Sequence, residues 1–213
     1  MNTYACWQGG SAGNCIVISV DYRLAPEHPY PDGLDDCKYI LTNYKEVLVD
    51  FKFKDEIIIT GDSAGGAICS SLSMFSQSDS NLKIDKQILI YPCVDYTMNS
   101  DSYKENGEGF LLEASKVEWY FENYFQNNED RVKASPLHGD ITASLPKTLI
   151  LTAGCDPLRD EGIAYAGALT SAGVAVTHYQ YDDMIHAFMN LEDLIQEECA
   201  DLYQRIGDFI KSN

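Results

Sequence analysis

The segment Gly61–Gly66, with the sequence Gly-Asp-Ser-Ala-Gly-Gly, constrains the fold of this chain more than any other. It follows an apolar run and opens a run of small residues that predicts a helix. A Gly-x-Ser-x-Gly motif between a strand and a helix predicts a sharp turn that lifts the serine, here Ser63, above a sheet. We expect glycine at Gly61 and Gly65 because strand and helix approach too closely there for a Cβ atom. A serine held in this way is usually a nucleophile for acyl transfer, and the alternative is a simple helix cap.

Length and pattern predict a single α/β domain over residues 1–213, in which a mostly parallel sheet is flanked by helices. The predicted strands are Cys15–Val20, Glu56–Thr60, Gln87–Tyr91, Thr148–Ala153 and Ala175–Tyr181. The predicted helices are Pro31–Tyr44, Ala64–Gln77, Glu113–Phe125, Asp160–Ala172 and Leu191–Lys211, with Gly173 as the carboxyl cap of the fourth. Residues 95–140 break the alternation and predict an insertion with one or two helices.

Composition excludes several classes of partner. The net charge of −18 argues against nucleic acid and against anionic membrane surfaces, and high solubility explains it most simply. No apolar run approaches the roughly 20 residues of a membrane span, and the amino-terminal residues do not resemble a signal peptide. The seven cysteines form no Cys-x-x-Cys pair, which predicts reduced cysteines in a cytoplasmic protein and no zinc site.

A serine nucleophile needs a base and an acid, and both have candidates later in the chain. Proteins with this turn place the acid and then the histidine after the serine, each beyond the carboxyl end of a strand. Of the four histidines only His186 satisfies both order and position, while His28, His138 and His178 have ordinary structural explanations. Asp156 is the first acid after its strand, and its alternative role is to cap the next helix. Asp160 is a weaker candidate that, like Glu161, is better explained as a first-turn acid facing the helix dipole.

Taken together, these segments resemble the bacterial hormone-sensitive-lipase-like esterases of the α/β-hydrolase fold. The matching segments are Asp21–Pro31, Gly61–Gly66, Tyr91-Pro92, Ser135–Leu137, Thr152–Gly162 and Met184–Phe188. The resemblance implies hydrolysis of short-to-medium acyl carboxylic esters, small molecules, without a metal or organic cofactor. It also implies Ser63 as nucleophile, Asp156 as acid and His186 as base.

The resemblance further implies a cap over the active site, formed by residues 95–140. Its aromatic residues are candidates for the substrate pocket, and ordinary packing of the cap helices is an equally good explanation: Tyr96, Phe110, Trp119 and Tyr120. The segment Asp21–Pro31 would be a structural loop beside the site.

The chain also departs from the family pattern. It has no His-Gly-Gly-Gly loop, whose N–H groups form most of the oxyanion hole, so the chain resembles an amino-terminally truncated member with the Ala64 N–H as its identifiable donor. The glycine-rich segment Trp7–Gly13 precedes a predicted strand and should lie at the amino edge of the sheet, away from the serine. Cys15–Val20 lacks its usual neighbours, so it either pairs with Glu56–Thr60 or leaves a gap that another chain fills, which favours a homo-oligomer. Glycine is usual in the family where Asp183 and Ala187 stand.

Three readings stay open on the sequence alone. The first is a serine esterase, whose triad could equally serve a lactonase, an amidase or a thioesterase. The second is a ligand-binding relative without turnover, like the plant gibberellin receptors, although those lack the working histidine. The third is a catalytically impaired chain that keeps the triad without a complete oxyanion hole.

Overall fold

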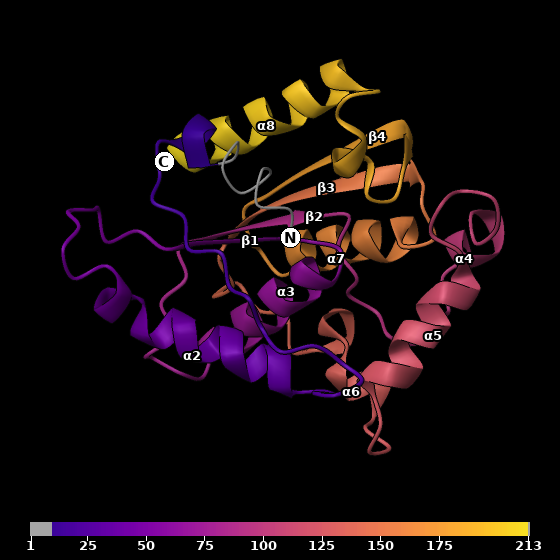
Figure 1. The fold of residues 1–213 in the computed structure, drawn as a ribbon, viewed down its shortest axis with the longest axis horizontal. Helices are drawn as coiled ribbons and strands as arrows, with labels where there is room; N and C mark the ends of the chain where they lie inside the picture. Colours follow the sequence, from indigo (N-terminus) through magenta and orange to yellow (C-terminus); the bar gives the residue numbers. More distant parts are fainter. Residues whose placement is uncertain (1–9, 213) are drawn as a thin grey trace.

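The computed structural model describes residues 10–212, and its centre is a parallel sheet of four strands in the order β1-β2-β3-β4 (Figure 1). The strands are β1 (Ile58–Asp62), β2 (Lys86–Ile90), β3 (Lys147–Cys155) and β4 (Val176–Ile185). The helices are α2 (Asp32–Val47), α3 (Ala64–Ser76), α4 (Ser102–Glu105), α5 (Ala114–Tyr124), α6 (Arg131–Ala134), α7 (Arg159–Ser171) and α8 (Gln196–Lys211), with 3-10 turns η1 (Pro136–His138) and η2 (Phe188–Leu191). The α/β class, four of the five predicted strands and the five predicted helices are confirmed, with shifted bounds.

Helices cover both faces of the sheet. Side chains that alternate along β3 enter different layers, so Leu151 packs with Leu202 of α8 while Ile150 packs with Leu169 of α7. Figure 1 shows α8 on one face, α3 and α7 on the other, and α2 outside α3. Every residue of β2 is buried, as expected for a central strand of a covered parallel sheet. The predicted carboxyl cap of α7 is also present, because Gly173 has a left-handed φ of +91°.

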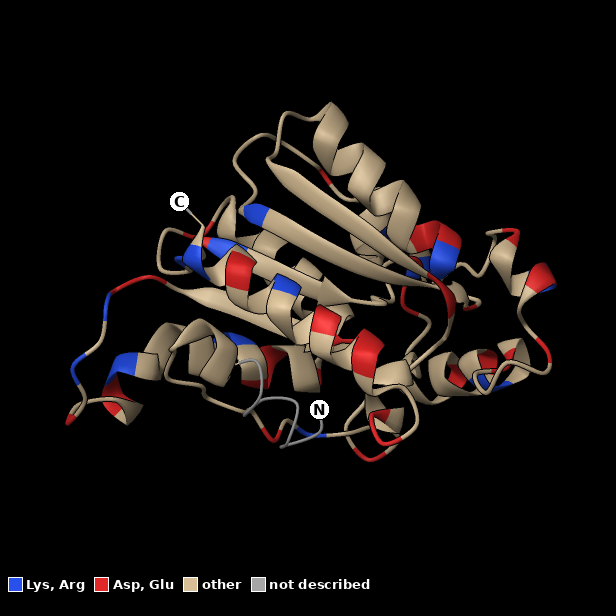
Figure 2. Cartoon of the chain, turned by 90° about the horizontal axis from the view of Figure 1, so that it is seen from above, with Lys and Arg blue, Asp and Glu red and all other residues tan. Residues whose placement is uncertain are grey.

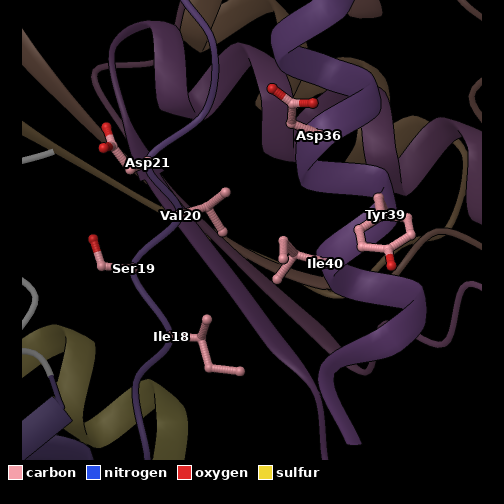
Figure 3. A pocket seen from close by; sticks show the side chains of 7 residues that line it. All are labelled: Ile18, Ser19, Val20, Asp21, Asp36, Tyr39 and Ile40. Atoms are coloured by element: carbon pink, nitrogen blue, oxygen red, sulfur yellow. The ribbon is translucent and has the colours of Figure 1, made fainter. Parts of the chain in front are cut away.

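The prediction of a strand at Cys15–Val20 is wrong. The segment is extended but joins no sheet, and β1 is an edge strand of the sheet that the described residues form. Figure 3 shows Ile18 and Val20 on the side facing α2, with Ser19 and Asp21 pointing away, beside a hollow of about 330 Å³. The alternation of side chains is strand-like, but a strand also needs a neighbouring backbone with which to exchange hydrogen bonds.

The glycine-rich segment before it is described only from Gly10 onward, and residues 7–9 of the predicted loop lie outside the described residues. Gly10 begins a short helical turn, and a Cβ atom on Gly13 would lie 2.7 Å from the side chain of Ile210 in the last turn of α8. Because Ile210 also contacts Lys86 at the start of β2, this part lies at the amino edge of the sheet, as predicted.

The insertion at residues 95–140 contains three helices, α4 to α6, and η1, so the prediction of one or two helices is too low, because α4 and α6 are single turns of four residues. Its aromatic residues Tyr96, Tyr103, Phe121 and Phe125 form an apolar cluster with Ala67 of α3 and with Leu158, so the insertion packs onto the body of the domain. The segment Asp21–Pro31 reaches this insertion, because the N–H of Tyr30 donates to the carbonyl of Tyr124 at 2.7 Å. The insertion lies off the carboxyl end of the sheet in Figure 1, where the chemistry of parallel sheets is placed.

The surface is acidic but not segregated. Figure 2 shows Asp and Glu scattered over the helices and loops, with Lys and Arg interspersed among them. This distribution fits solubility as the explanation of the net charge of −18. Within residues 10–212, no helix combines the length and the apolar character that crossing a membrane requires.

Candidate active site

Ser63 occupies the sharp turn between β1 and α3. Its backbone has φ +52° and ψ −116°, a conformation that a non-glycine residue rarely adopts and that is found where the surroundings enforce it. The N–H of Ser63 donates to the carbonyl of Ile90 at 2.9 Å, and its carbonyl accepts from the N–H of Cys93 at 3.3 Å. The end of β2 therefore holds the turn from both sides.

The glycines around Ser63 differ in what requires them. A Cβ atom on Gly61 would lie 2.2 Å from the backbone of Gly65, so the predicted close approach of strand and helix is confirmed there. The same reason is wrong for Gly65, whose Cβ atom would meet only Asp62 Oδ1 at 3.9 Å. Gly66 is the second crowded position, because its Cβ atom would lie 2.7 Å from Pro92.

Ser63, His186 and Asp156 meet at the carboxyl end of the sheet. His186 Nε2 lies 2.9 Å from Ser63 Oγ, and His186 Nδ1 lies 2.7 Å from Asp156 Oδ2. His186 is 5% exposed and Asp156 is fully buried, so water is largely excluded from their contact. The side chains come from three strand ends and form a hydrogen-bonded row in the order serine, histidine, aspartate.

The alternative role of Asp156, capping the next helix, is wrong, because the N-cap of α7 is Leu158 and no side chain caps it. While Oδ2 faces His186, Oδ1 accepts from the N–H of Leu158 at 2.8 Å, which anchors the turn that leads into α7. Asp160 has a different task, since its carboxylate accepts from the N–H of Ser102 at 2.8 Å and from Arg159 Nε at 2.8 Å. The structure therefore places Asp156, and not Asp160, beside the histidine.

The loop that carries Asp156 is held by the first helix of the insertion. Ser102 Oγ donates to the carbonyl of Pro157 at 2.6 Å, and Arg159 binds Glu105 at 2.6 Å. Asn106, which follows α4, donates from Nδ2 to the carbonyl of Asp156 at 3.2 Å. Sequence reasoning missed this clamp because its partners lie 50 to 55 residues apart and no local pattern links them.

Glu161 lies in the first turn of α7, as predicted, but nothing in the sequence indicated that it is buried, with 1% of it exposed. Its Oε1 accepts from the N–H groups of Val94 and Asp95 at 2.7 and 3.1 Å, and Tyr103 donates to Oε2 at 3.2 Å. Burial raises the pKa of the Glu161 carboxyl to about 8, although the N–H groups of Asp95 and Val94 oppose the shift. Glu161 ties the start of the insertion to α7.

The remaining predicted residues are placed as follows. Ala64 is the first residue of α3 and is exposed, so its N–H belongs to the free amino end of the helix. Tyr96 is buried among the aromatic residues of the cap, and its ring centroid lies 4.9 Å from that of Phe125. This contact agrees with ordinary packing of the cap as the role of Tyr96. Trp119 and Tyr120 are each 49% exposed and lie near the ammonium of Lys116.

Phe110 is partly buried in the stretch between α4 and α5. The part of these four aromatic residues in substrate binding stays a prediction.

The other histidines have ordinary partners. His28 Nδ1 lies 3.2 Å from Asp32, and His138 Nε2 lies 3.2 Å from Asp95. His178 lies 2.9 Å from Thr152 Oγ1 on the neighbouring strand, and partial burial lowers its pKa. Among residues 10–212, no group of three or more His, Cys, Asp or Glu could hold a metal ion.

Comparison with known proteins identifies the class. A family profile described as the α/β-hydrolase fold matches residues 2–190. The ethyl acetate hydrolase of Pseudomonas putida is 33% identical over 199 residues, which cover 90% of this chain and 62% of that protein. The arylesterase of Saccharolobus solfataricus is 34% identical over 182 residues, covering 82% of this chain and 58% of that protein.

Solved structures agree with this assignment. The hyperthermophilic esterase of Pyrobaculum calidifontis superposes with a TM-score of 0.86 at 33% identity, covering 98% of this chain and 70% of that one. An ester hydrolase from the metagenome of Lake Arreo gives a TM-score of 0.91 at 32% identity, covering 97% of this chain and 66% of that one. The chain therefore belongs to the α/β-hydrolase fold family, and the predicted resemblance to the hormone-sensitive-lipase-like esterases is confirmed. It spans about three fifths of the length of the curated relatives that it matches first.

Proposed function

We propose that the chain is a serine carboxylic ester hydrolase that acts on short-to-medium acyl esters through an acyl-enzyme. The observation that carries this proposal is the pair of contacts of His186, 2.9 Å to Ser63 Oγ and 2.7 Å to Asp156 Oδ2. The curated relatives named ethyl acetate hydrolase and arylesterase support the substrate class.

In the proposed reaction, Ser63 Oγ attacks the ester carbonyl while its proton passes to His186 Nε2. A carboxylate only accepts hydrogen bonds, so Asp156 keeps the proton of His186 on Nδ1 and leaves Nε2 free to act as the base. The N–H of Ala64 stabilises the oxyanion of the tetrahedral intermediate. His186 then protonates the leaving alcohol, and water, activated by the same histidine, releases the acid and restores Ser63.

The proposed alternative is a chain that keeps the triad geometry but turns over slowly. It is favoured by one observation, the exposure of Ala64, because an oxyanion donor in contact with water stabilises charge less than one in a dry site. Removing a single oxyanion donor costs about 10²–10³ in turnover in a serine hydrolase.

Hydrolysis of p-nitrophenyl acetate, butyrate and decanoate by the chain and its Ser63→Ala variant tests the proposal. Ser78→Ala, at an exposed serine beyond the end of α3, is the matched control, and circular dichroism verifies that all three are folded. We expect turnover, fastest for the shorter esters, to fall at least about 10³-fold in Ser63→Ala and to persist in Ser78→Ala.

Covalent labelling with a fluorophosphonate separates the two candidates. Labelling of Ser63 with little ester turnover is the result expected of the impaired chain. A folded protein that neither hydrolyses the esters nor takes up the label contradicts both, and saturable ligand binding without turnover would then favour a receptor.

We further propose a cytoplasmic, self-associating protein. Six free cysteines among residues 10–212 fit a reducing compartment. Self-association is supported by the edge strand β1 and by Ile16 and Val17, which are both more than 40% exposed. Light scattering after size-exclusion chromatography gives the mass, and a monomer at all concentrations tested would contradict it.

A further inference from the structure

Tyr91, the residue that follows β2, packs directly against His186. The two ring centroids are 4.8 Å apart and the ring planes are inclined at 60°. The tyrosine is 1% exposed, and its ring also packs against Phe188, with the ring centroids 5.8 Å apart. The imidazole of His186 therefore has a rigid aromatic wall on one side.

The backbone on either side of Tyr91 contacts Ser63. Ile90, one residue before, accepts from the N–H of Ser63, and Cys93, two residues after, donates to the carbonyl of Ser63. Tyr91 itself donates from its N–H to Leu151 at 2.6 Å, which fixes it to β3. One short segment thus touches the serine through its backbone and the histidine through the Tyr91 ring.

The backbone of Tyr91 is strained as well. Its φ is +35°, a left-handed value that is uncommon for a bulky residue and costs free energy. Ser63 and Ala187 also have left-handed backbones, and the three residues lie just beyond the ends of β1, β2 and β4. Strain of this kind persists where the surrounding structure enforces it, and it concentrates at functional sites.

We propose that Tyr91 is a positioning residue, whose ring holds the imidazole of His186 at hydrogen-bond distance from Ser63. This inference rests on the proposed function. The proton moves from Ser63 Oγ to His186 Nε2 only when the two atoms are aligned, and small misplacements cost large factors in rate. An imidazole without its wall samples other orientations, so kcat falls. KM should change little, because Tyr91 is 1% exposed and offers almost no surface to a bound ester.

Three variants test this proposal. Tyr91→Leu removes the aromatic wall, and Tyr91→Phe keeps the ring without the hydroxyl. Tyr181→Leu is the matched control, because Tyr181 is also buried in the same core and lies 5.1 Å from Phe188 but is not in ring contact with His186. If Tyr91→Leu does not fold, Tyr91→Met replaces it, since methionine fills irregular core space without a rigid plane.

We expect kcat for p-nitrophenyl butyrate to fall roughly 10- to 100-fold in Tyr91→Leu, with KM within about twofold of the wild-type value. Labelling of Ser63 by the fluorophosphonate should slow in parallel. Tyr91→Phe and Tyr181→Leu should both stay within about threefold of the wild-type kcat. Unchanged kcat in Tyr91→Leu, or an equal loss in either of the other variants, would overturn the proposal.

A spectroscopic readout keeps this test separate from the proposed function. The hydrogen-bonded Nδ1 proton of His186 gives a downfield proton resonance that does not depend on turnover. If the wild-type chain neither hydrolyses nor labels, the esterase proposal fails. Tyr91 still positions His186 if the resonance is present in the wild type and in Tyr91→Phe but lost in Tyr91→Leu, and it does not if Tyr91→Leu keeps the resonance.

Discussion

The ammonium group of Lys86, at the start of β2, donates to the backbone carbonyl of Ile210 in the last turn of α8 over 2.8 Å. It also donates to the carbonyl of Ser212 at 2.7 Å and pairs with Glu56 at 2.8 Å, and its side chain is 7% exposed. The last carbonyls of a helix lack partners within the helix, and a lysine is a favourable one. Lys86 therefore ties α8 to the amino end of the sheet, together with Lys147, which donates to Ser212 Oγ at 2.9 Å.

Lys86→Met should lower the free energy of unfolding by roughly 1–3 kcal/mol, because it leaves the partly buried carbonyls of Ile210 and Ser212 without their donor, while Glu56 keeps its pair with Lys54. Lys104→Met is the control, since Lys104 is exposed and its ion pair is with the exposed Asp101. Urea denaturation followed by circular dichroism measures both. An equal, small effect in the two variants would show that the buried bonds contribute little.

Glu161→Gln should change how stability depends on pH. The folded-state pKa of Glu161, about 8, lies above its usual value of 4.5, so folding favours the protonated form. The stability that Glu161 contributes to the folded state is complete below about pH 4.5 and is lost as the pH rises towards 8. Glutamine is neutral at every pH and keeps the acceptor for Val94 and Asp95, so the variant should gain stability relative to wild type at pH 8 but not at pH 4.5. Thermal unfolding at the two pH values checks this, and an equal difference at both would contradict it.

Asn106→Ala should loosen the loop that carries Asp156. Its Nδ2 donates to the carbonyls of Gly154 and Asp156, and the side chain is buried, so the loss costs roughly 1–3 kcal/mol of stability. We also expect a lower kcat, because Asp156 orients His186. Asn123→Ala removes a side-chain bond to a carbonyl on the exposed side of α5 and should leave kcat unchanged. Steady-state kinetics of the two variants beside wild type gives the answer, and equal kcat values in all three would exclude a link to the acid.

Ala187→Gly should stabilise the protein by about 1 kcal/mol. Ala187 has φ +59° and ψ 23°, a left-handed conformation that glycine adopts without the cost of a Cβ atom. Ala172→Gly is the reference, because Ala172 has a right-handed helical backbone and loses stability with glycine. Thermal unfolding of both variants should give shifts of opposite sign, and shifts of the same sign would argue against strain at Ala187.

Gly66→Ala and Gly65→Ala should differ sharply. The added methyl group at Gly66 would lie 2.7 Å from Pro92, whereas at Gly65 it would meet only the Asp62 side chain at 3.9 Å. We expect the first variant to lose roughly 1–3 kcal/mol through overpacking and the second to fold as well as wild type. The midpoints of urea denaturation measure the stability of both variants. Comparable losses of stability would mean that the turn tolerates a methyl group at neither position.

The sequence predicted the class, most elements and the relative positions of Ser63, Asp156 and His186. These succeeded because apolar runs mark the strands of a covered parallel sheet, and residues just beyond the strand ends must gather at one edge. The strand at Cys15–Val20 failed because apolar alternation is local, while a strand exists only when a second backbone pairs with it.

The contacts of Lys86 and Asn106 could not be predicted, because each depends on carbonyl groups in distant segments. Lys86 and Ile210 are 124 residues apart in the chain. Asn106 and Asp156 are 50 residues apart, and nothing in the sequence around Asp156 predicts a contact with the end of α4. The burial of Glu161 could not be predicted for a related reason. A glutamate in the first turn of a helix normally faces water, and only the arrival of Val94 and Asp95 makes its burial possible.

The hydrogen bonds between α4 and the Asp156 loop also bear on how substrate range could be engineered in this family. A cap is an attractive part to exchange between relatives, since it is one continuous stretch of chain. In this chain, a cap taken from a relative would bring its own helix at the position of α4. That helix would then contact an Asp156 loop that evolved beside a different α4. A chimera built by moving residues 95–140 alone would therefore disturb the acid along with the pocket, and a functional exchange would need residues 154–161 to travel with the cap.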